Sequence, residues 1–119
     1  MVARLHQRTH FTRLRAHGTT VREGKIRVVC APPDPDSEIE GPALAFAVPR
    51  AFGTAVMRNR VRRRLRAVVH ELEHAGEIPI GWFLVNVLPG AAEPGYGQLR
   101  RWFSDVMARP EVRDAVGAP

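Results

Sequence analysis

The chain has 119 residues, of which 45% are hydrophobic and 25% charged, as expected for one globular domain, and its formal net charge is +6. The single cysteine, Cys30, excludes an internal disulfide and favours a reducing compartment. No apolar run approaches the roughly 20 residues that cross a bilayer, and the N-terminal residues are too polar for a signal peptide. We therefore expect a cytoplasmic protein.

The predicted elements follow the order helix, strand, strand, helix, strand, helix. They are a helix over residues 4–18, strands over 25–31 and 43–49, a helix over 55–74 that Thr54 caps, a strand over 81–90 and a helix over 95–110. This order predicts an α+β fold, a small α/β sandwich whose sheet of three to four strands has helices packed on it. We expect one domain over residues 1–109 and a weakly ordered tail over 110–119.

The positive charge is concentrated in two segments. Residues 1–27 carry seven basic side chains and one acidic, and residues 58–66 carry six arginines and no acid. The two remaining segments, 28–57 and 67–119, each have a net charge of −3. A protein that is basic only for solubility would distribute its charge evenly, so this placement predicts a polyanionic partner.

The helix over 55–74 carries the second basic segment. Helical spacing places its apolar side chains on one stripe, made of Met57, Val61, Leu65, Val68, Val69 and Leu72. The arginines cover most of the remaining circumference and form like-charged pairs four residues apart, which destabilise a helix. A solvated charged face is the ordinary alternative. An unneutralised arginine cluster is more typical of a surface that binds a phosphate backbone.

Residues 70–74, HELEH, match the H-E-x-x-H pattern of zinc hydrolases, with His70 and His74 as ligands and Glu71 as base. The segment AGEIPI does not continue the longer signature, Glu93 lies beyond an intervening strand, and both histidines project from the polar side of the arginine helix. We therefore expect no metal site and no catalytic residue in the protein itself.

The first basic segment combines an aromatic side chain with cations, in Phe11, Arg13, Arg15 and His17. This combination is typical of surfaces that bind single-stranded nucleic acid. Phe11 is equally compatible with a core position of the first helix, and the residues alone leave both interpretations open.

The segment FGTAVMRNRVRRRLR resembles the bacterial ribonuclease P protein subunit, whose signature is G-x-A-V-x-R-N-R-x-[KR]-R. The matching positions are Gly53, Ala55, Val56, Arg58, Asn59, Arg60, Arg62 and Arg63. The resemblance extends upstream to Phe11, His17 and Gly18 and downstream to Trp102 and Phe103, so that it spans roughly residues 4–108.

The resemblance implies a sandwich with a left-handed βαβ crossover, a fold also found in a ribosomal protein. It implies a non-catalytic subunit of an endoribonuclease, whose partners are the catalytic RNA and precursor tRNA. The sequence leaves self-association open, and we expect the free protein to be a monomer. That RNA would use magnesium ions to remove the 5′ leader in tRNA processing, and the protein would need no cofactor. The RNA-binding helix would comprise Arg58, Asn59, Arg60, Arg62, Arg63 and Arg66. The leader cleft would comprise Phe11, Arg13, Arg15, His17 and Arg50.

Some positions depart from the family pattern. Arg15 stands where many relatives have a second cleft aromatic residue, and Val29 replaces another, so leader binding is expected to depend more on charge than on stacking. The fold and charge would equally suit a structural RNA-binding protein, such as a ribosomal protein or an RNA chaperone, without a role in cleavage. A DNA-binding regulator is a less favoured alternative, because the sequence shows no short helix–turn–helix pair.

Overall fold

The computed structural model describes residues 2–90 and 92–116. Its elements are β1 (Ala3–Arg4), α1 (Arg8–His17), β2 (Thr19–Glu23), β3 (Ile26–Ala31), β4 (Ala43–Ala47), a 3-10 turn η1 (Arg50–Phe52), α2 (Ala55–His74), β5 (Trp82–Val87), α3 (Tyr96–Ala108) and α4 (Pro110–Ala115). The strands form a five-stranded sheet in the order β1-β4-β5-β3-β2. The α+β sandwich expected from the sequence is confirmed, with one strand more than the three to four expected.

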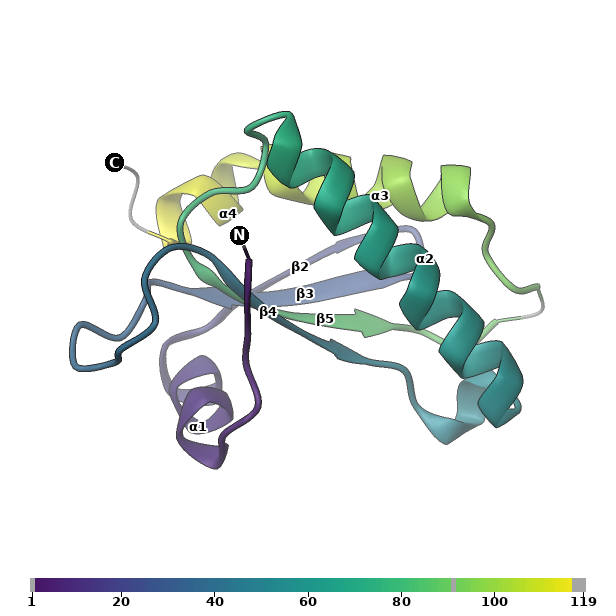
Figure 1. Cartoon of the computed structure of the whole chain (residues 1–119), viewed down its shortest axis with the longest axis horizontal. Helices are drawn as coiled ribbons and strands as arrows, with labels where there is room; N and C mark the ends of the chain where they lie inside the picture. The colour runs from purple at the N-terminus through teal and green to yellow at the C-terminus, as the bar shows by residue number, and fades with distance from the viewer. Residues whose placement is uncertain (1, 91, 117–119) are drawn as a thin grey trace.

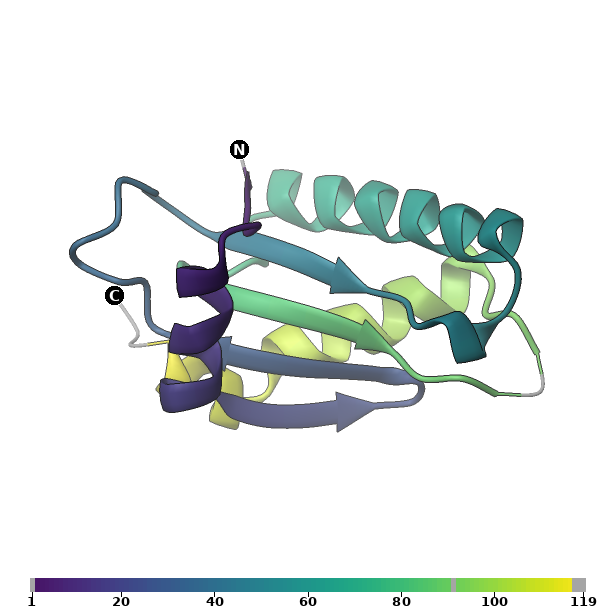
Figure 2. The ribbon, with the colours of Figure 1, turned by 90° about the horizontal axis from the view of Figure 1, so that it is seen from below.

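Helices cover the two faces of the sheet unequally. α2, α3 and α4 lie on one face, and α1 lies on the other across one end of the strands (Figures 1 and 2). The larger core joins α2, α3 and α4 to the sheet through side chains such as Val28, Leu65 and Phe103, each fully buried. A smaller core beneath α1 contains Leu5, Leu14, Ala31, Ala43 and Trp82. Away from α1, none of the helices in the described part of the chain covers the second face.

The β4–α2–β5 unit joins two adjacent parallel strands. Seen from the side of α1, both strands point the same way (Figure 2), and α2 lies on the opposite face of the sheet from α1 (Figure 1). The chain leaves β4, returns behind the sheet through α2 and enters β5 in a left-handed sense, which is rare among such crossovers. This agrees with the handedness that the resemblance implied.

Three expectations about secondary structure were wrong. Residues 19–23 form β2, which pairs with β3 in a hairpin, although only Val21 of this strand is buried. The first helix begins at Arg8 rather than at residue 4, because residues 3 and 4 form β1 along the edge of β4. Residues 110–115 are α4, not a weakly ordered tail, since Val112 and Val116 pack into the larger core. Residues 117–119 lie outside the described residues.

Two glycines permit close approaches between elements. Gly24 turns the β2–β3 hairpin with φ +57°, and a Cβ there would lie 2.1 Å from the ring of Trp102 on α3. Gly18 joins α1 to β2, and a Cβ there would lie 2.1 Å from the Leu14 carbonyl oxygen and 2.5 Å from Val29 Cγ1. The hairpin is therefore packed beneath α3, and α1 is packed against β3, only because these positions lack side chains.

Candidate nucleic-acid interface

The orientation of α2 is fixed at its first turn and along its apolar stripe. The Thr54 hydroxyl accepts a hydrogen bond from the Met57 backbone N–H at 3.2 Å, as an N-cap does. Five apolar side chains are buried against the sheet and α3: Val61, Leu65, Val68, Val69 and Leu72. Burial of this stripe leaves the arginines on the outward-facing sides of the helix.

The arginines of α2 fall into two groups. The Arg60 guanidinium donates two hydrogen bonds to Glu93, at 2.8 Å from Nε and 2.7 Å from Nη2. Arg64 Nη1 donates to the same carboxylate at 2.5 Å and to the Pro94 carbonyl oxygen at 3.0 Å. These hydrogen bonds, the Arg60 bond foremost, lower the pKa of Glu93 from its ordinary 4.5 to about 2, so that the carboxylate is ionised at neutral pH.

The other group has no such carboxylate. Arg62 Nη1 donates to the Asn59 side-chain oxygen at 3.2 Å, and Arg63 and Arg66 are exposed. Arg58 is half-buried, and its Nε has no hydrogen-bond partner in the part of the chain that the structure describes. These cations carry their charge without an acidic partner among the described residues, as a phosphate-binding surface requires.

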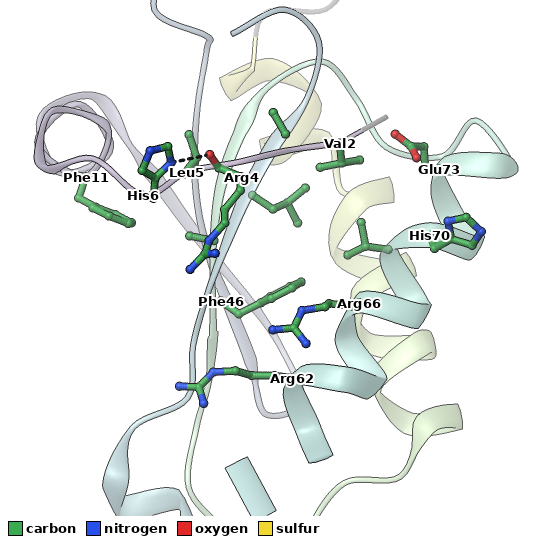
Figure 3. A pocket seen from close by; sticks show the side chains of 14 residues that line it. Val2, Arg4, Leu5, His6, Phe11, Phe46, Arg62, Arg66, His70 and Glu73 are labelled. Atoms are coloured by element: carbon green, nitrogen blue, oxygen red, sulfur yellow. Dashed lines mark hydrogen bonds between the residues drawn. The ribbon is translucent and has the colours of Figure 1, made fainter. Parts of the chain in front are cut away.

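A groove of about 560 Å³ lies between α1 and α2, along the edge of the sheet formed by β1 and β4. Arg4, Arg62 and Arg66 point into it together with Phe46, and Phe11 lies on the α1 side (Figure 3). His6, His70 and Glu73 line its rim. An apolar surface surrounded by three arginines offers both base-stacking and phosphate-binding groups.

A second groove of about 320 Å³ lies at the opposite end of β4. Its lining residues include Arg27 of β3, Asn86 of β5 and, from α2, Arg62, which also lines the first groove. Arg27 and Asn86 are register partners on the uncovered face of the sheet. The two grooves therefore share one arginine and follow the same strand.

The five residues expected in the leader cleft are not brought together. Phe11 lines the first groove and also packs on the core beneath α1. Arg13 instead donates to the carbonyl oxygens of Pro32 and Pro33, at 3.1 and 3.2 Å. Arg15 and His17 are exposed on α1, and Arg50 is exposed in η1 at the other end of the sheet (Figure 2).

Several residues at these grooves did not emerge from the sequence. Arg4 and Phe46 line the first groove, and Arg27 and Asn86 the second. Strand alternation could have placed Arg27 on the same face as Val29. No local signal indicates that β1 brings Arg4 to the edge of β4 or that Glu93 reaches α2, because both depend on long-range pairing.

The N-terminus of α1 is held by a buried histidine. His10 Nδ1 accepts hydrogen bonds from the backbone N–H groups of His6 and Gln7, both at 3.2 Å, and its ring stands edge-on to Trp82 at 5.0 Å. Desolvation, with a smaller contribution from His6, lowers the pKa of His10 below 6.5. A neutral His10 therefore positions the helix that carries Phe11.

The remaining candidate chemistry is engaged in structure. Glu71 of the HELEH segment accepts hydrogen bonds from Tyr96 and Arg100, so it links α2 to α3. Over residues 2–90 and 92–116, no group of three His, Cys, Asp or Glu side chains is placed to hold a metal ion. Burial raises the pKa of the Cys30 thiol to about 11, which makes it a poor nucleophile. No described helix is both long and apolar enough to span a bilayer.

These features define a class: a small α/β sandwich in which a polycationic helix crosses between two parallel strands. The family model for ribonuclease P matches residues 2–111 of the chain. The chain therefore belongs to the ribonuclease P protein family, the protein component of an endoribonuclease complex.

Individual relatives agree with this assignment. The ribonuclease P protein component of Micrococcus luteus is 42% identical over 93 residues, which cover 70% of each chain. That of Mycobacterium avium is 38% identical over 90 residues, or 74% of each chain. The ribonuclease P protein of Staphylococcus aureus has the same fold, with a TM-score of 0.76, 21% identity and coverage of 94% of this chain and 98% of that one.

Proposed function

We propose that this protein binds the catalytic RNA of ribonuclease P and the 5′ leader of precursor tRNA, and so assists RNA-catalysed removal of the leader. The observation that carries the proposal is the surface of α2 where Arg58, Arg62, Arg63 and Arg66 lack acidic partners among the described residues. Family membership supports the assignment of that surface to ribonuclease P rather than to another RNA.

The two faces of the arginine surface suit different RNA elements. Arg63 is exposed on the outer side of α2, where it can reach the backbone of a folded RNA. Arg62 and Arg66 point into the first groove beside Phe46 (Figure 3). A single strand, whose bases are free to stack, fits such a groove better than a duplex. We therefore assign the catalytic RNA to the outer side of α2 and the leader to the grooves along β4.

The chemistry in this proposal belongs to the RNA. The magnesium ions would be held by RNA phosphates, and the protein would lower the repulsion between two polyanions as the substrate binds. Tighter substrate binding and lower magnesium demand would follow from the same neutralisation. In the cell, the proposal places the protein with its RNA in the cytoplasm.

The test is cleavage of a precursor tRNA at low magnesium concentration by a bacterial ribonuclease P RNA, with and without the protein. Strong stimulation, with no cleavage by the protein alone, is the expected result. Arg62→Gln combined with Arg63→Gln should reduce the stimulation at moderate salt. Tight RNA binding without any stimulation would contradict the proposal and favour a structural RNA-binding protein.

A further inference from the structure

Glu93 presents its carboxylate to α2 as a phosphate group would. The two carboxylate oxygens accept parallel hydrogen bonds from Arg60, Oε2 from Nε and Oε1 from Nη2, and Arg64 donates a third to Oε2. Planar, two-point pairing of this kind is the geometry with which arginine also binds phosphate. An RNA phosphate and Glu93 would therefore compete for the same guanidinium groups.

The position of Glu93 favours the intramolecular partner. The carboxylate lies in the segment between β5 and α3, and its side chain is only 16% exposed, compared with 39% for Arg60 and 29% for Arg64. The Pro94 carbonyl oxygen, next to Glu93 in the chain, accepts a further hydrogen bond from Arg64. Four interactions thus attach this segment to one side of α2, and a phosphate would have to replace all of them.

We propose that Glu93 is a specificity-determining residue: it commits Arg60 and Arg64 to the β5–α3 segment and leaves RNA phosphates to Arg58, Arg62, Arg63 and Arg66. The inference rests on the proposed function. Each additional phosphate contact adds affinity that is independent of RNA sequence and decreases with salt. Glu93 keeps two of the six arginines of α2 from contacting RNA phosphates. This reduces the affinity for unrelated RNA more than the affinity for the RNA that fits the whole surface.

The experiment compares Glu93→Gln with a matched control, Glu111→Gln. Both variants raise the net charge by one and break an Arg–Glu ion pair, but Glu111 pairs with Arg109 at the α3–α4 junction, away from α2. Dissociation constants are measured from about 50 to 200 mM salt for two probes, a bacterial ribonuclease P RNA and an unrelated folded RNA of equal length. The readout is the slope of log affinity against log salt, which a purely structural role of Glu93 would not steepen.

Glu93→Gln should steepen the slope by about 0.7–0.9 for each arginine released, which is about threefold in affinity per arginine over this salt range. The preference for ribonuclease P RNA over the unrelated RNA should fall, and Glu111→Gln should match the wild type. Arg60→Gln should leave the slope unchanged, whereas Arg63→Gln should lower it by about 0.7–0.9. This second pair of variants also carries the test if Glu93→Gln does not fold.

An unchanged slope in folded Glu93→Gln, or equal losses in Arg60→Gln and Arg63→Gln, would overturn the inference. The wild-type protein separates this failure from that of the proposed function. If the wild type binds ribonuclease P RNA and stimulates cleavage, only the role of Glu93 is refuted. If it does neither, the proposed function itself is wrong.

Discussion

Gly18→Ala tests the contact that holds α1 against the sheet. Gly18 has extended backbone angles that any residue can adopt, so an alanine there suffers no backbone strain. The obstacle is space, because the added Cβ would lie 2.1 Å from the Leu14 carbonyl oxygen and 2.5 Å from Val29 Cγ1. Carbon atoms pack best at about 3.5–4.0 Å, so the contact with Val29 of β3 would have to open by on the order of 1 Å, and the last turn of α1, which carries the Leu14 carbonyl, would have to deform as well.

The expected cost follows from what that movement disturbs. Leu14 is 1% exposed and packs with Trp82 in the smaller core, which α1 closes. Inserting a methyl group into such packing costs about 1–3 kcal/mol. Gly97→Ala is the matched control, since Gly97 is an exposed position within α3 with nothing within 4 Å of its added Cβ. Helix propensity predicts that this control gains stability, by less than the about 0.5–1 kcal/mol of a helix interior, because Gly97 lies in the first turn of α3.

Urea unfolding of both variants measures these opposite signs directly. A Gly18→Ala protein as stable as the wild type would refute the close approach of α1 to β3. Because α1 also carries Phe11 of the first groove, the variant should lose part of the holoenzyme's preference for precursor tRNA over mature tRNA. The salt dependence of its binding to ribonuclease P RNA should stay unchanged, since α2 is anchored elsewhere.

Three further predictions concern the cap of α2 and two titrating groups. Thr54→Ala removes the hydrogen bond to Met57 and should cost about 1 kcal/mol in urea unfolding, and Thr54→Ser should restore most of it. Because the pKa of Glu93 is lowered from 4.5 to about 2, its contribution to stability is complete above pH 4.5 and is lost as the pH falls toward 2. The stability difference between wild type and Glu93→Gln should shrink over that window, and a constant difference would contradict the ion pair. Because the pKa of His10 is lowered in the folded protein, this side chain is protonated in the unfolded chain before the folded one as the pH falls below 6.5. The free energy of unfolding should therefore decrease below pH 6.5, and it should decrease less in His10→Gln. Unfolding midpoints between about pH 5 and 7 check this, and equal slopes for the two proteins would refute it.

The sequence predicts elements well where the signal is local. The α2 helix, Ala55–His74, has the predicted bounds, because the Thr54 cap and the apolar stripe lie within the helix itself. In β2 only Val21 is buried, so the strand has no apolar alternation and depends on pairing with β3. The missed α4 did carry a local signal: Val112 and Val116 are one helical turn apart, and Pro110 suits the first turn of a helix as well as the end of one.

The site was less predictable, because it depends on how distant segments meet. The RNR signature located the cationic helix, but Arg60 was expected to face RNA and is instead paired with a carboxylate 33 positions along the chain. Arg50 was expected in one cleft with the basic residues of α1, but η1, which contains Arg50, and α1 lie at opposite ends of the sheet (Figure 2). The distribution of charge along the sequence predicts that the partner is a polyanion. Only the packing shows which arginines are free of carboxylate partners among the described residues and can therefore bind it.

The edge of β4 connects the two cationic regions that the sequence separates. β1 covers this edge only at Ala43 and Leu44, so the following residues of β4 remain open beside α2. The first groove brings Arg4 from the N-terminal basic segment next to Arg62 and Arg66, and the second continues past Arg62 to Arg27. A single RNA strand along β4 would thus contact both basic segments in succession, with Arg62 at the junction. Under the proposed function, this geometry lets two basic segments that are separate in the sequence bind one polyanion.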